Sequence, residues 1–522
     1  MNFPVKVLII DPGSNRSEIN EPIGIGSISS YLQKYVAHPV IIREHFMQID
    51  GMPAVEALNS ANIVGIATRL GSFNHLHAVR SLIMAIPPSN RPLLVLGDLI
   101  ATYATHELLE IFPEAVCVIG EGEEAMSGLV SAYVRAQLEH TKLPDMLFRL
   151  QVPNLTFLRN GKTNFTPRRL LDITGSPAPR RQFAQRIAER GGIIRAEASR
   201  GCEWSKCKFC AIKYKYCEIA CRRPVQIERI VEELCELSSM GIRSPFYTDE
   251  DFVGNDPIWI LALTKAIRHA KDNGRIVKQL NFYANARAES IIAPDKNGKP
   301  SGRYLFRELR LAGLREVFVG IESGSASQKR RYYKSNKVND ALAAITLLTE
   351  LGISIDIGFI MFDPEMTIGD LKKNLDFICD ANLKTHDARL TKELRVIPKT
   401  GLFEKYRTKN LISGPLDINE LIYPCRWVNS DAEAVYLAFT SWEKPYLDIM
   451  YDLQAKTRGE VPSENIRRRR KRMLGRLRAV DLDVLRTLLD RMEQGSELTT
   501  ANLDHFRRRR DLLIAEMQPI FR

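Results

Sequence analysis

Long apolar runs are missing from this 522-residue chain, and no stretch approaches the roughly 20 consecutive apolar residues that a membrane-spanning helix needs. The first residues, MNFPVKVLIIDPG, include a short apolar stretch but lack the cationic start and small-residue cleavage site of a signal peptide. Cysteine, at 9 residues, is too sparse for a disulfide framework. We therefore expect a cytoplasmic protein whose first residues form a β-strand.

Neither hydrophobic nor charged residues are scarce, at 45% and 26% of the chain, which is close to the average for soluble globular proteins. This balance excludes a disordered or collagen-like chain, and the length suggests about three domains. The net charge of +12 is concentrated near the end of the chain, because residues 463–522 contain 15 basic and 9 acidic residues.

The first part of the chain, residues 1–140, alternates short apolar β-rich runs with helical patterns. Strands that are apolar throughout and alternate with helices predict a parallel sheet covered on both faces, hence a doubly wound α/β domain. Such domains bind ligands beyond the carboxyl ends of their strands. Residues 141–193 lose this regularity, and Asn160-Gly161 lies between alternating apolar residues. We interpret 141–193 as a linker carrying one β-hairpin.

A second series of strands and helices occupies residues 194–414, with six candidate strands separated by helical segments. This pattern predicts a partial (β/α)6 barrel with functional residues at the carboxyl ends of its strands. Residues 415–522 are expected to form a small α-rich basic domain. Its arginine runs, 467–472 and 507–510, are compatible with nucleic-acid binding or with an exposed or interface helix. The second interpretation is favoured, since no RNA-recognition signature accompanies them.

Five of the nine cysteines fall within residues 202–221. Three of them, Cys202, Cys207 and Cys210, lie on one loop directly after the first barrel strand. Three thiolates can hold one four-iron four-sulfur cluster and leave one iron open to substrate. The alternative is a structural zinc ion with Cys217 or Cys221 as fourth ligand. Spacing alone leaves both kinds of site open.

The sequence around these cysteines resembles the radical S-adenosylmethionine (SAM) superfamily, whose Cys-x3-Cys-x2-Cys loop holds a 4Fe-4S cluster. Phe209 occupies the family's aromatic position before the third cysteine, and residues 199–202 (SRGC) are also typical. Later segments that match in order are 247–251 (YTDED), 285–287, 320–325 (GIESGS) and 358–364 with Thr367. One departure is that four residues, not three, separate Cys202 from Cys207. Together the matches favour the cluster over zinc.

The resemblance implies a set of residues that bind SAM. Thr248, Asp249 and Glu250 would accept hydrogen bonds from its α-amino group, and Phe209 would pack near the adenine. The remaining implied contacts are those of Arg287 and of Glu322 and Ser323, the last two to ribose or methionyl polar atoms. For each residue the alternative is an ordinary polar side chain in a barrel mouth. The resemblance also implies an electron donor such as flavodoxin or ferredoxin, and a small-molecule substrate.

The first domain resembles the cobalamin-binding domain fused to one branch of these enzymes. The matching landmarks are residues 22–26 (PIGIG), 63–68, 95–97 and 120–123 (GEGE). The residues implied to line the corrin are Gly24, Gly26, Thr68, Gly97, Gly120, Glu121 and Gly122. The Asp-x-His-x-x-Gly signature is absent, and Asp98 replaces a usual second glycine. Cobalamin would thus bind without a protein histidine, or the domain is a scaffold that has lost its cofactor.

The resemblance as a whole implies a cobalamin-dependent radical SAM enzyme that uses a 5′-deoxyadenosyl radical. The commonest outcome in this branch is methylation of an unactivated position, here on a small-molecule or natural-product substrate, which makes the enzyme a methyltransferase. One alternative is a rearrangement or cyclisation without net methyl transfer. Another is a cobalamin- or nucleic-acid-binding sensor with an inactive barrel. The sequence indicates neither the substrate nor a catalytic residue, and none of the nine histidines is assigned to a metal.

Overall fold

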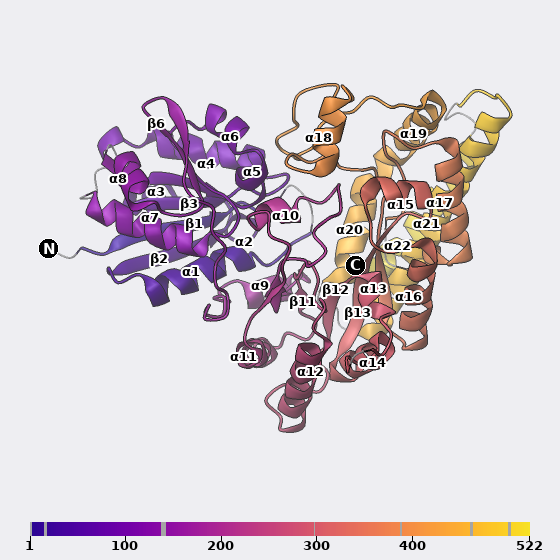
Figure 1. Ribbon diagram of the computed structural model, residues 1–522, viewed down its shortest axis with the longest axis horizontal. Helices are drawn as coiled ribbons and strands as arrows, with labels where there is room; N and C mark the ends of the chain where they lie inside the picture. Colours follow the sequence, from indigo (N-terminus) through magenta and orange to yellow (C-terminus); the bar gives the residue numbers. More distant parts are fainter. Residues whose placement is uncertain are drawn as a thin grey trace.

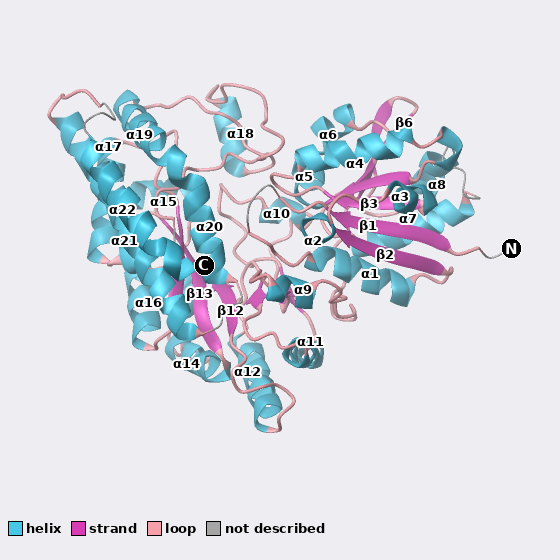
Figure 2. Ribbon diagram, turned by 180° about the vertical axis from the view of Figure 1, so that it is seen from behind, coloured by secondary structure: helices cyan, strands magenta, loops and turns pink. Residues whose placement is uncertain are grey.

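The computed structural model describes residues 3–14, 18–136, 142–296, 298–386, 389–459, 463–498 and 503–521. An α/β domain at the N-terminus lies beside a second body built on a smaller sheet, and the last helices of the chain pack on that second body (Figures 1 and 2). The predicted fold class, a doubly wound domain followed by a partial barrel and C-terminal helices, is confirmed. No helix within the described ranges is long and apolar enough to cross a membrane.

The N-terminal sheet has seven strands in the order β2-β1-β3-β4-β5-β6-β7. Its parallel strands are β1 (Val5–Asp11), β2 (Val40–Phe46), β3 (Ile63–Ala67), β4 (Leu93–Gly97) and β5 (Val116–Val118). Along β1, Val7 belongs to one apolar cluster and the adjacent Leu8 to another, on the opposite face of the sheet. Both faces are therefore buried, which explains why the strands are apolar at every position.

Helices on the two faces supply the rest of these clusters. One face is covered by α1 (Ile23–Tyr35) and α7 (Glu123–Arg135). The other face is covered by α3 (Val55–Ser60), α4 (Phe73–Ala85), α5 (Asp98–Tyr103) and α6 (Thr105–Ile111). The carboxyl ends of the parallel strands point toward the second body (Figure 1).

The stretch that the sequence predicts as a linker adds two strands to the N-terminal sheet. Strands β6 (Leu155–Arg159) and β7 (Lys162–Phe165) form the expected hairpin, and Asn160 and Gly161 both have positive φ, 52° and 72°, as a type I′ turn requires. The hairpin pairs with β5, because Leu155 and Phe157 are buried in the same core as the first domain. Helix α8 (Leu143–Leu150) packs there too. The predicted boundary at residue 140 lies outside the described residues.

The second sheet has five parallel strands in the order β14-β13-β12-β11-β8. They are β8 (Arg195–Ala196), β11 (Phe246–Tyr247), β12 (Phe282–Ala286), β13 (Leu314–Glu322) and β14 (Ser354–Phe359). Helices α11 (Ile227–Ser239), α12 (Pro257–Asp272), α14 (Gly302–Ala312), α16 (Val338–Glu350) and α17 (Ile368–Asp380) cover its outer face. The predicted sixth strand, 393–401, forms only one parallel bridge, between Glu393 and Phe362. Its apolar residues Leu394 and Val396 pack in a separate cluster with Tyr332.

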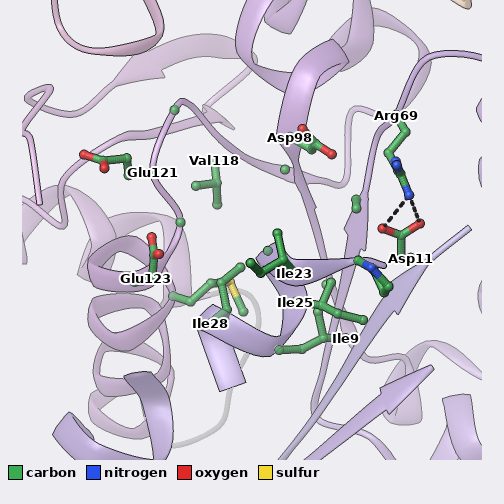
Figure 3. A pocket seen from close by; sticks show the side chains of 18 of the residues that line it. Ile9, Asp11, Ile23, Ile25, Ile28, Arg69, Asp98, Val118, Glu121 and Glu123 are labelled. Carbon is green, nitrogen blue, oxygen red and sulfur yellow. Dashed lines mark hydrogen bonds and ion pairs between the residues drawn. The ribbon is translucent and has the colours of Figure 1, made fainter. Parts of the chain in front are cut away.

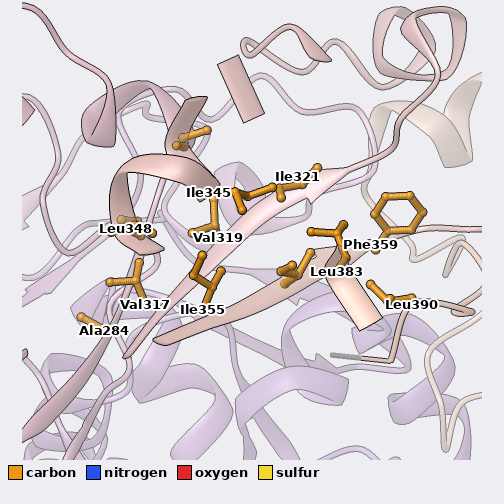
Figure 4. Packing of buried hydrophobic residues seen from close by; sticks show 14 of the residues in the cluster. Ala284, Val317, Val319, Ile321, Ile345, Leu348, Ile355, Phe359, Leu383 and Leu390 are labelled. Atoms are coloured by element: carbon orange, nitrogen blue, oxygen red, sulfur yellow. The ribbon is translucent and has the colours of Figure 1, made fainter. Parts of the chain in front are cut away.

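Alternate residues of the barrel strands face opposite sides of the sheet. Val317, Val319 and Ile321 of β13, with Ile355 of β14, join the apolar core beneath the outer helices (Figure 4). The residues next to them along the strands, such as Glu316 and Asp356, therefore face the inside of the barrel.

The C-terminal helices cover this inner face around Glu316 and Asp356. They are α19 (Ser430–Glu443), α20 (Leu447–Arg458), α21 (Glu464–Glu493) and α22 (Asp504–Phe521). Arg458 forms an ion pair with Asp356, and Lys471 forms one with Glu316. Arg467 lies 5.1 Å from the ring of Tyr283 on β12. The predicted helices are present, but they share the apolar core of the barrel rather than forming a core of their own.

The arginine runs of the tail are partly buried. Arg467, Arg470 and Arg510 are 3%, 8% and 0% exposed, and their guanidinium groups face partners within the chain. These contacts fit the interpretation of the runs as interface helices.

Candidate functional site

A cavity of about 300 Å³ separates the carboxyl strand ends of the N-terminal domain from the barrel. Its volume falls within the range of about 300–1,000 Å³ seen for small-molecule and cofactor sites. On one side it is lined by Ile9, Asp11, Gly24, Arg69, Gly97, Asp98, Val118 and residues 120–123 (Figure 3). The barrel side consists of Arg195, Glu197, Ser199, Arg200, Lys215, Tyr216, Thr248 and Glu250. Both domains therefore contribute to one site, as the strand-end rule for α/β folds leads one to expect.

Most of the residues predicted to line the corrin do line this cavity: Gly24, Gly97, Gly120, Glu121 and Gly122. Gly26 and Thr68 do not. A Cβ on Gly26 would lie 2.4 Å from the carbonyl oxygen of Arg180, so this glycine is needed for close backbone packing. The Thr68 hydroxyl donates to Gly97 O (2.5 Å) and accepts from Ala101 N (2.9 Å), which holds it between β3 and the start of α5.

Charged groups lie at the domain side of the cavity. Arg69 donates to both carboxylate oxygens of Asp11 at 3.2 Å (Figure 3). Asp98, which stands where the resembled domain usually has glycine, has a φ of 75°. A non-glycine residue in this left-handed region carries a conformational cost of order 1 kcal/mol. Burial raises the pKa of its carboxyl, and the nearby Arg69 opposes that rise.

Glu250 lies at the barrel side of the same cavity. Its carboxylate accepts hydrogen bonds from Gly201 N (2.8 Å) and the Tyr216 hydroxyl (2.9 Å), and Lys215 Nζ is 3.3 Å away. Burial alone would raise the pKa of Glu250, but Lys215 and these hydrogen bonds hold it below its ordinary value. A charged carboxylate is thus fixed next to the cysteine motif and facing the first domain.

Arg200, next to Gly201, joins the two domains electrostatically. Its guanidinium contacts Glu121 at 3.0 Å and Glu123 at 2.7 Å in the N-terminal domain, and Glu197 at 2.8 Å in the barrel. Arg223 adds a second contact to Glu121 at 2.9 Å. These pairs are mostly buried, so breaking one leaves an uncompensated charge.

The cysteine loop accommodates its extra residue through local backbone conformation. Ser205 has a φ of 41°, in the left-handed region, and its hydroxyl donates to the carbonyl of Cys202. Trp204 stacks on Tyr333 with ring centroids 5.9 Å apart. Gly201 has a φ of 94°, and a Cβ there would lie 2.1 Å from the carbonyl oxygen of Cys221. The four-residue spacing therefore forms a compact turn, and glycine is required at position 201, just before the first cysteine.

The three predicted cluster ligands face a common region. Burial raises the pKa of Cys210 to about 12, and the charges of Cys207 and Cys202 add to that rise. Burial likewise raises the pKa of Cys207 to about 11, while Lys334 opposes it. The three sulfurs are thus close enough to interact, which fits the donor set of a cluster with three protein ligands.

The zinc alternative needs Cys217 or Cys221 as a fourth ligand beside the three thiols. Cys217 lies beside Arg168 and Arg223, apart from the other thiols. Within the described ranges, no three His, Cys, Asp or Glu side chains, those of Cys202, Cys207 and Cys210 included, are already placed to hold a single metal ion.

Three of the predicted SAM residues are engaged within the barrel wall. The Asp249 carboxylate accepts from Ala198 N (3.0 Å) and from the Ser199 hydroxyl (2.5 Å). Arg287 pairs with Asp251 at 2.7 Å. The Ser323 hydroxyl bonds to Gln328 and Asn374, and Ser323 is fully buried. These side chains match the alternative of ordinary polar residues that support the site.

The other predicted SAM residues lie closer to the cysteines or the cavity. Glu322 has a φ of 67° and pairs at 3.2 Å with Lys334, whose charge acts on Cys207. Phe209 packs edge-on against Tyr332, with ring centroids 5.4 Å apart. Thr248 lines the cavity beside Glu250.

Several residues of the site escape sequence reasoning: Arg69, Arg195, Lys215, Tyr216 and Lys334. Lys334 follows α15 (Ala326–Tyr332), where no motif marks it. Lys215 and Tyr216 lie in the same stretch as the cysteines, so their proximity to the motif was the available signal.

Comparisons with known proteins agree with this geometry. The family model of the radical SAM superfamily matches residues 197–378, which include the cysteine loop and strands β11 to β14. Residues 197–378 form a radical SAM domain. A curated relative from Priestia megaterium, 4'-phospho-dehydrooxetanocin synthase, is 26% identical over 395 residues, which are 70% of this chain and 49% of the relative. The chain therefore spans about half the length of that relative.

Solved structures show that the fold extends beyond the radical SAM domain. The cobalamin-dependent SAM radical enzyme OxsB, with aqua-cobalamin bound, superposes with a TM-score of 0.79 at 20% identity, over 97% of this chain and 75% of that one. The radical SAM methyltransferase TsrM from Kitasatospora setae, with cobalamin and a [4Fe-4S] cluster bound, has a TM-score of 0.64 at 15% identity, over 95% and 100% of the two chains. The N-terminal domain and the radical SAM domain are thus arranged as in these enzymes.

Proposed function

We propose that this chain is a cobalamin-dependent radical SAM enzyme acting on a small molecule. It would hold a 4Fe-4S cluster on Cys202, Cys207 and Cys210, SAM beside that cluster, and cobalamin in the interdomain cavity. The observation that carries the proposal is the cavity itself. Its barrel side presents Glu250, bonded to the cysteine motif at Gly201, and its other side consists of glycine-containing strand ends of the first domain.

The residues of the chain have defined tasks in this proposal. When bound, the cluster, SAM and cobalamin supply radical generation and one-carbon or redox chemistry. Lys334 and Glu322 form the polar pair next to Cys207, so we assign them to the amino acid end of SAM. Glu250 and Thr248 line the cavity on the barrel side, where they would face cobalamin and the substrate. Arg200 keeps the two domains in register.

The similar proteins support two different reaction outcomes. Methyl transfer to an unactivated position is the first, and TsrM, which is named a methyltransferase, shares the fold. Ring formation or rearrangement without net methyl transfer is the second, and the curated relative, which is named a synthase and not a methyltransferase, supports it. A sensor with an inactive barrel is disfavoured, since the cysteine loop is intact. With a substrate in hand, SAM carrying a deuterated methyl group separates the two, because only methyl transfer moves the label into product.

The cluster assignment is tested by anaerobic reconstitution. We expect Cys207→Ser to lose most of its bound iron and sulfide, because three-ligand sites do not tolerate loss of a thiolate. Cys217→Ser is the matched control, since it lies in the same stretch outside the group, and it should load as the wild type does. The reverse pattern would assign the metal to Cys217 and overturn the proposal.

The cobalamin assignment is tested by incubation with hydroxocobalamin, desalting and recording the visible spectrum. We expect corrin absorbance to co-elute with the protein. If none does, the first domain is a scaffold without cofactor, and a cobalamin-free radical SAM enzyme becomes the better account. An electron donor such as flavodoxin or ferredoxin completes the proposed system.

A further inference from the structure

A loop that follows the barrel in the sequence docks on the N-terminal domain. This docking loop, residues 416–423, comes after α18 (Gly401–Thr408), which lies on the side of the second body that faces α5 and α6 (Figures 1 and 2). Leu421 is 2% exposed, because it is buried in the apolar cluster that α4, α5 and α6 form on one face of the N-terminal sheet. Leu416 and Ile418 pack against the same cluster. The loop is therefore part of the core of the first domain.

Hydrogen bonds fix the conformation of the docking loop. Asp417 and Ile422 form an antiparallel bridge, with N···O distances of 2.9 and 3.2 Å. The Asp417 carboxylate also accepts from Asn419 N at 3.0 Å. Tyr423 N donates to Val396 O at 3.0 Å, which ties the loop to the predicted sixth strand of the barrel. The loop thus presents Asn419 to the first domain in a defined position.

Asn419 binds the turn between β3 and α4. Its carbonyl oxygen accepts from Gly71 N at 2.9 Å, and its side-chain Oδ1 accepts from Phe73 N at 3.1 Å. Phe73 is the first residue of α4, and the side chain of the N-cap residue, Ser72, makes no capping hydrogen bond. The first amides of a helix have no partner within the helix. Asn419 therefore supplies a cap that the first domain does not provide itself.

The same turn carries Arg69 to the cavity. Ser72 is fully buried, and its hydroxyl (2.6 Å) and backbone N (3.2 Å) both donate to the carbonyl oxygen of Arg69. The Arg69 guanidinium lines the cavity, where it pairs with Asp11 at 3.2 Å. Residues 69–73 thus form one hydrogen-bonded unit, which Asn419 holds at the helix start and Asp11 holds at the cavity.

We propose that Asn419 is a positioning residue of the cobalamin site and that it acts by holding Arg69 in place at the cavity. The inference rests on the proposed function, because it takes the cavity as the cobalamin site. None of residues 416–423, all of which the structure describes, lines the cavity. Corrin affinity therefore depends on a loop of the second body that lies outside the cavity.

Titration of the full-length, cluster-reconstituted protein with hydroxocobalamin, measured by corrin absorbance after desalting, tests the proposal. We expect Asn419→Ala to weaken corrin binding about three- to tenfold, as the loss of one hydrogen bond would. Asn419→Asp keeps an acceptor oxygen for Phe73 N and should bind corrin as the wild type does. Ser413→Ala is the matched control, because Ser413 is exposed just before the docking loop, and it should also equal the wild type.

A double substitution separates positioning from general stability. If Asn419 acts through Arg69, Asn419→Ala should weaken corrin binding little further in a chain that already carries Arg69→Gln. A merely structural contribution would instead add in full, because the two losses would be independent. Cluster iron is measured in every sample, and we expect it to be the same in all of them.

The possible failures can be told apart. Unchanged corrin affinity in Asn419→Ala, or in Arg69→Gln, overturns the positioning role and leaves the proposed function intact. The same conclusion follows if the two losses add in full, if Asn419→Asp binds corrin as weakly as Asn419→Ala, or if Asn419→Ala loses its cluster iron. If the wild type retains no corrin, the proposed function fails, and the positioning role fails with it.

Discussion

Individual buried groups determine how the barrel wall supports the cysteine motif. Asp249 is 1% exposed, and its carboxylate joins the segment before the motif through Ala198 and Ser199. Burial raises its pKa to about 7, more than these hydrogen bonds lower it. In an unfolded chain an aspartate has a pKa of about 3.9. Asp249 is therefore a supporting residue whose charge state changes near neutral pH.

This difference predicts a pH dependence of stability. Because the folded state retains a proton that the unfolded state releases, the contribution of Asp249 is complete below about pH 4. It is lost as the pH rises toward about 7, by at most about 1.4 kcal/mol per pH unit. Urea unfolding of the wild type and of Asp249→Asn across this range should differ in slope. Parallel curves would show that Asp249 does not titrate as described.

Glycines at the domain contact give a second prediction at this scale. Gly120 has a φ of 79°, and a Cβ there would lie 2.6 Å from the carbonyl oxygen of Lys215. We expect Gly120→Ala to lower thermal stability and to reduce corrin retention, because it pushes the two domains apart. Gly161→Ala is the control, since it has a φ of 72° with nothing within 4 Å, and it should cost only about 1–2 kcal/mol of backbone strain. Equal effects of the two substitutions would contradict the contact.

At the scale of elements, the C-terminal helices are an integral part of the barrel. Arg510 of α22 is 0% exposed, lies 3.0 Å from Asp481 of α21, and sits 4.6 Å from the ring of Trp442 on α19. Three helices thus meet at one cation. Burial raises the pKa of Asp481 to about 7, and Arg510 opposes the rise.

Substitution of this arginine should destabilise the protein more than substitution of an exposed arginine does. We expect Arg510→Ala to lower the free energy of unfolding by about 3–5 kcal/mol, since the buried Asp481 would lose its paired cation. Arg509→Ala, which breaks an exposed pair with Asp483 at 2.9 Å, should cost less than about 1 kcal/mol. Denaturant unfolding measures both. The loss in Arg510→Ala should shrink at lower pH, where Asp481 is protonated, and a loss that is independent of pH would argue for packing alone.

At the scale of the whole molecule, two folded bodies share one cavity and are joined by buried charge. Arg200 contacts two glutamates of the first domain, and Arg181, 6% exposed, bridges Glu21 to Glu233 at the same junction. Burial alone would raise the pKa of Glu121, yet Arg200 and Arg223 hold it below its ordinary value. Buried ion pairs thus contribute to the relative position of the domains.

A substitution at this junction should affect cofactors unequally. We expect Arg200→Gln to retain its cluster iron but to lose corrin several-fold faster on desalting, because only the interdomain site needs both bodies in register. Arg186→Gln, which removes an exposed pair with Asp50 at 2.7 Å, is the control. If Arg200→Gln kept corrin as well as the control does, the junction would not define the cobalamin site.

Sequence reasoning succeeded where structure follows local pattern. The all-apolar strands predicted two-sided burial, which Val7 and Leu8 display, and Asn160-Gly161 predicted the hairpin. Prediction from the sequence failed where tertiary packing decides the local structure. Leu394 and Val396 alternate with polar residues as in a strand, but they are buried in a separate apolar cluster. The predicted sixth strand therefore forms only one bridge to the sheet. Gly26 matches a ligand motif but serves a backbone contact, a distinction that no spacing reveals.

The ion pairs between the barrel strands and the C-terminal helices have a consequence for synthesis of the protein. Asp356 precedes Arg458 by 102 positions, and Glu316 precedes Lys471 by 155. At about 5–20 residues per second, a ribosome needs roughly 8 to 30 seconds to make Lys471 after Glu316. Throughout that interval the strands of the nascent barrel carry carboxylates and apolar surface without their cover. The barrel therefore matures only after α21 has emerged, and until then the nascent chain presents a surface that suits chaperones.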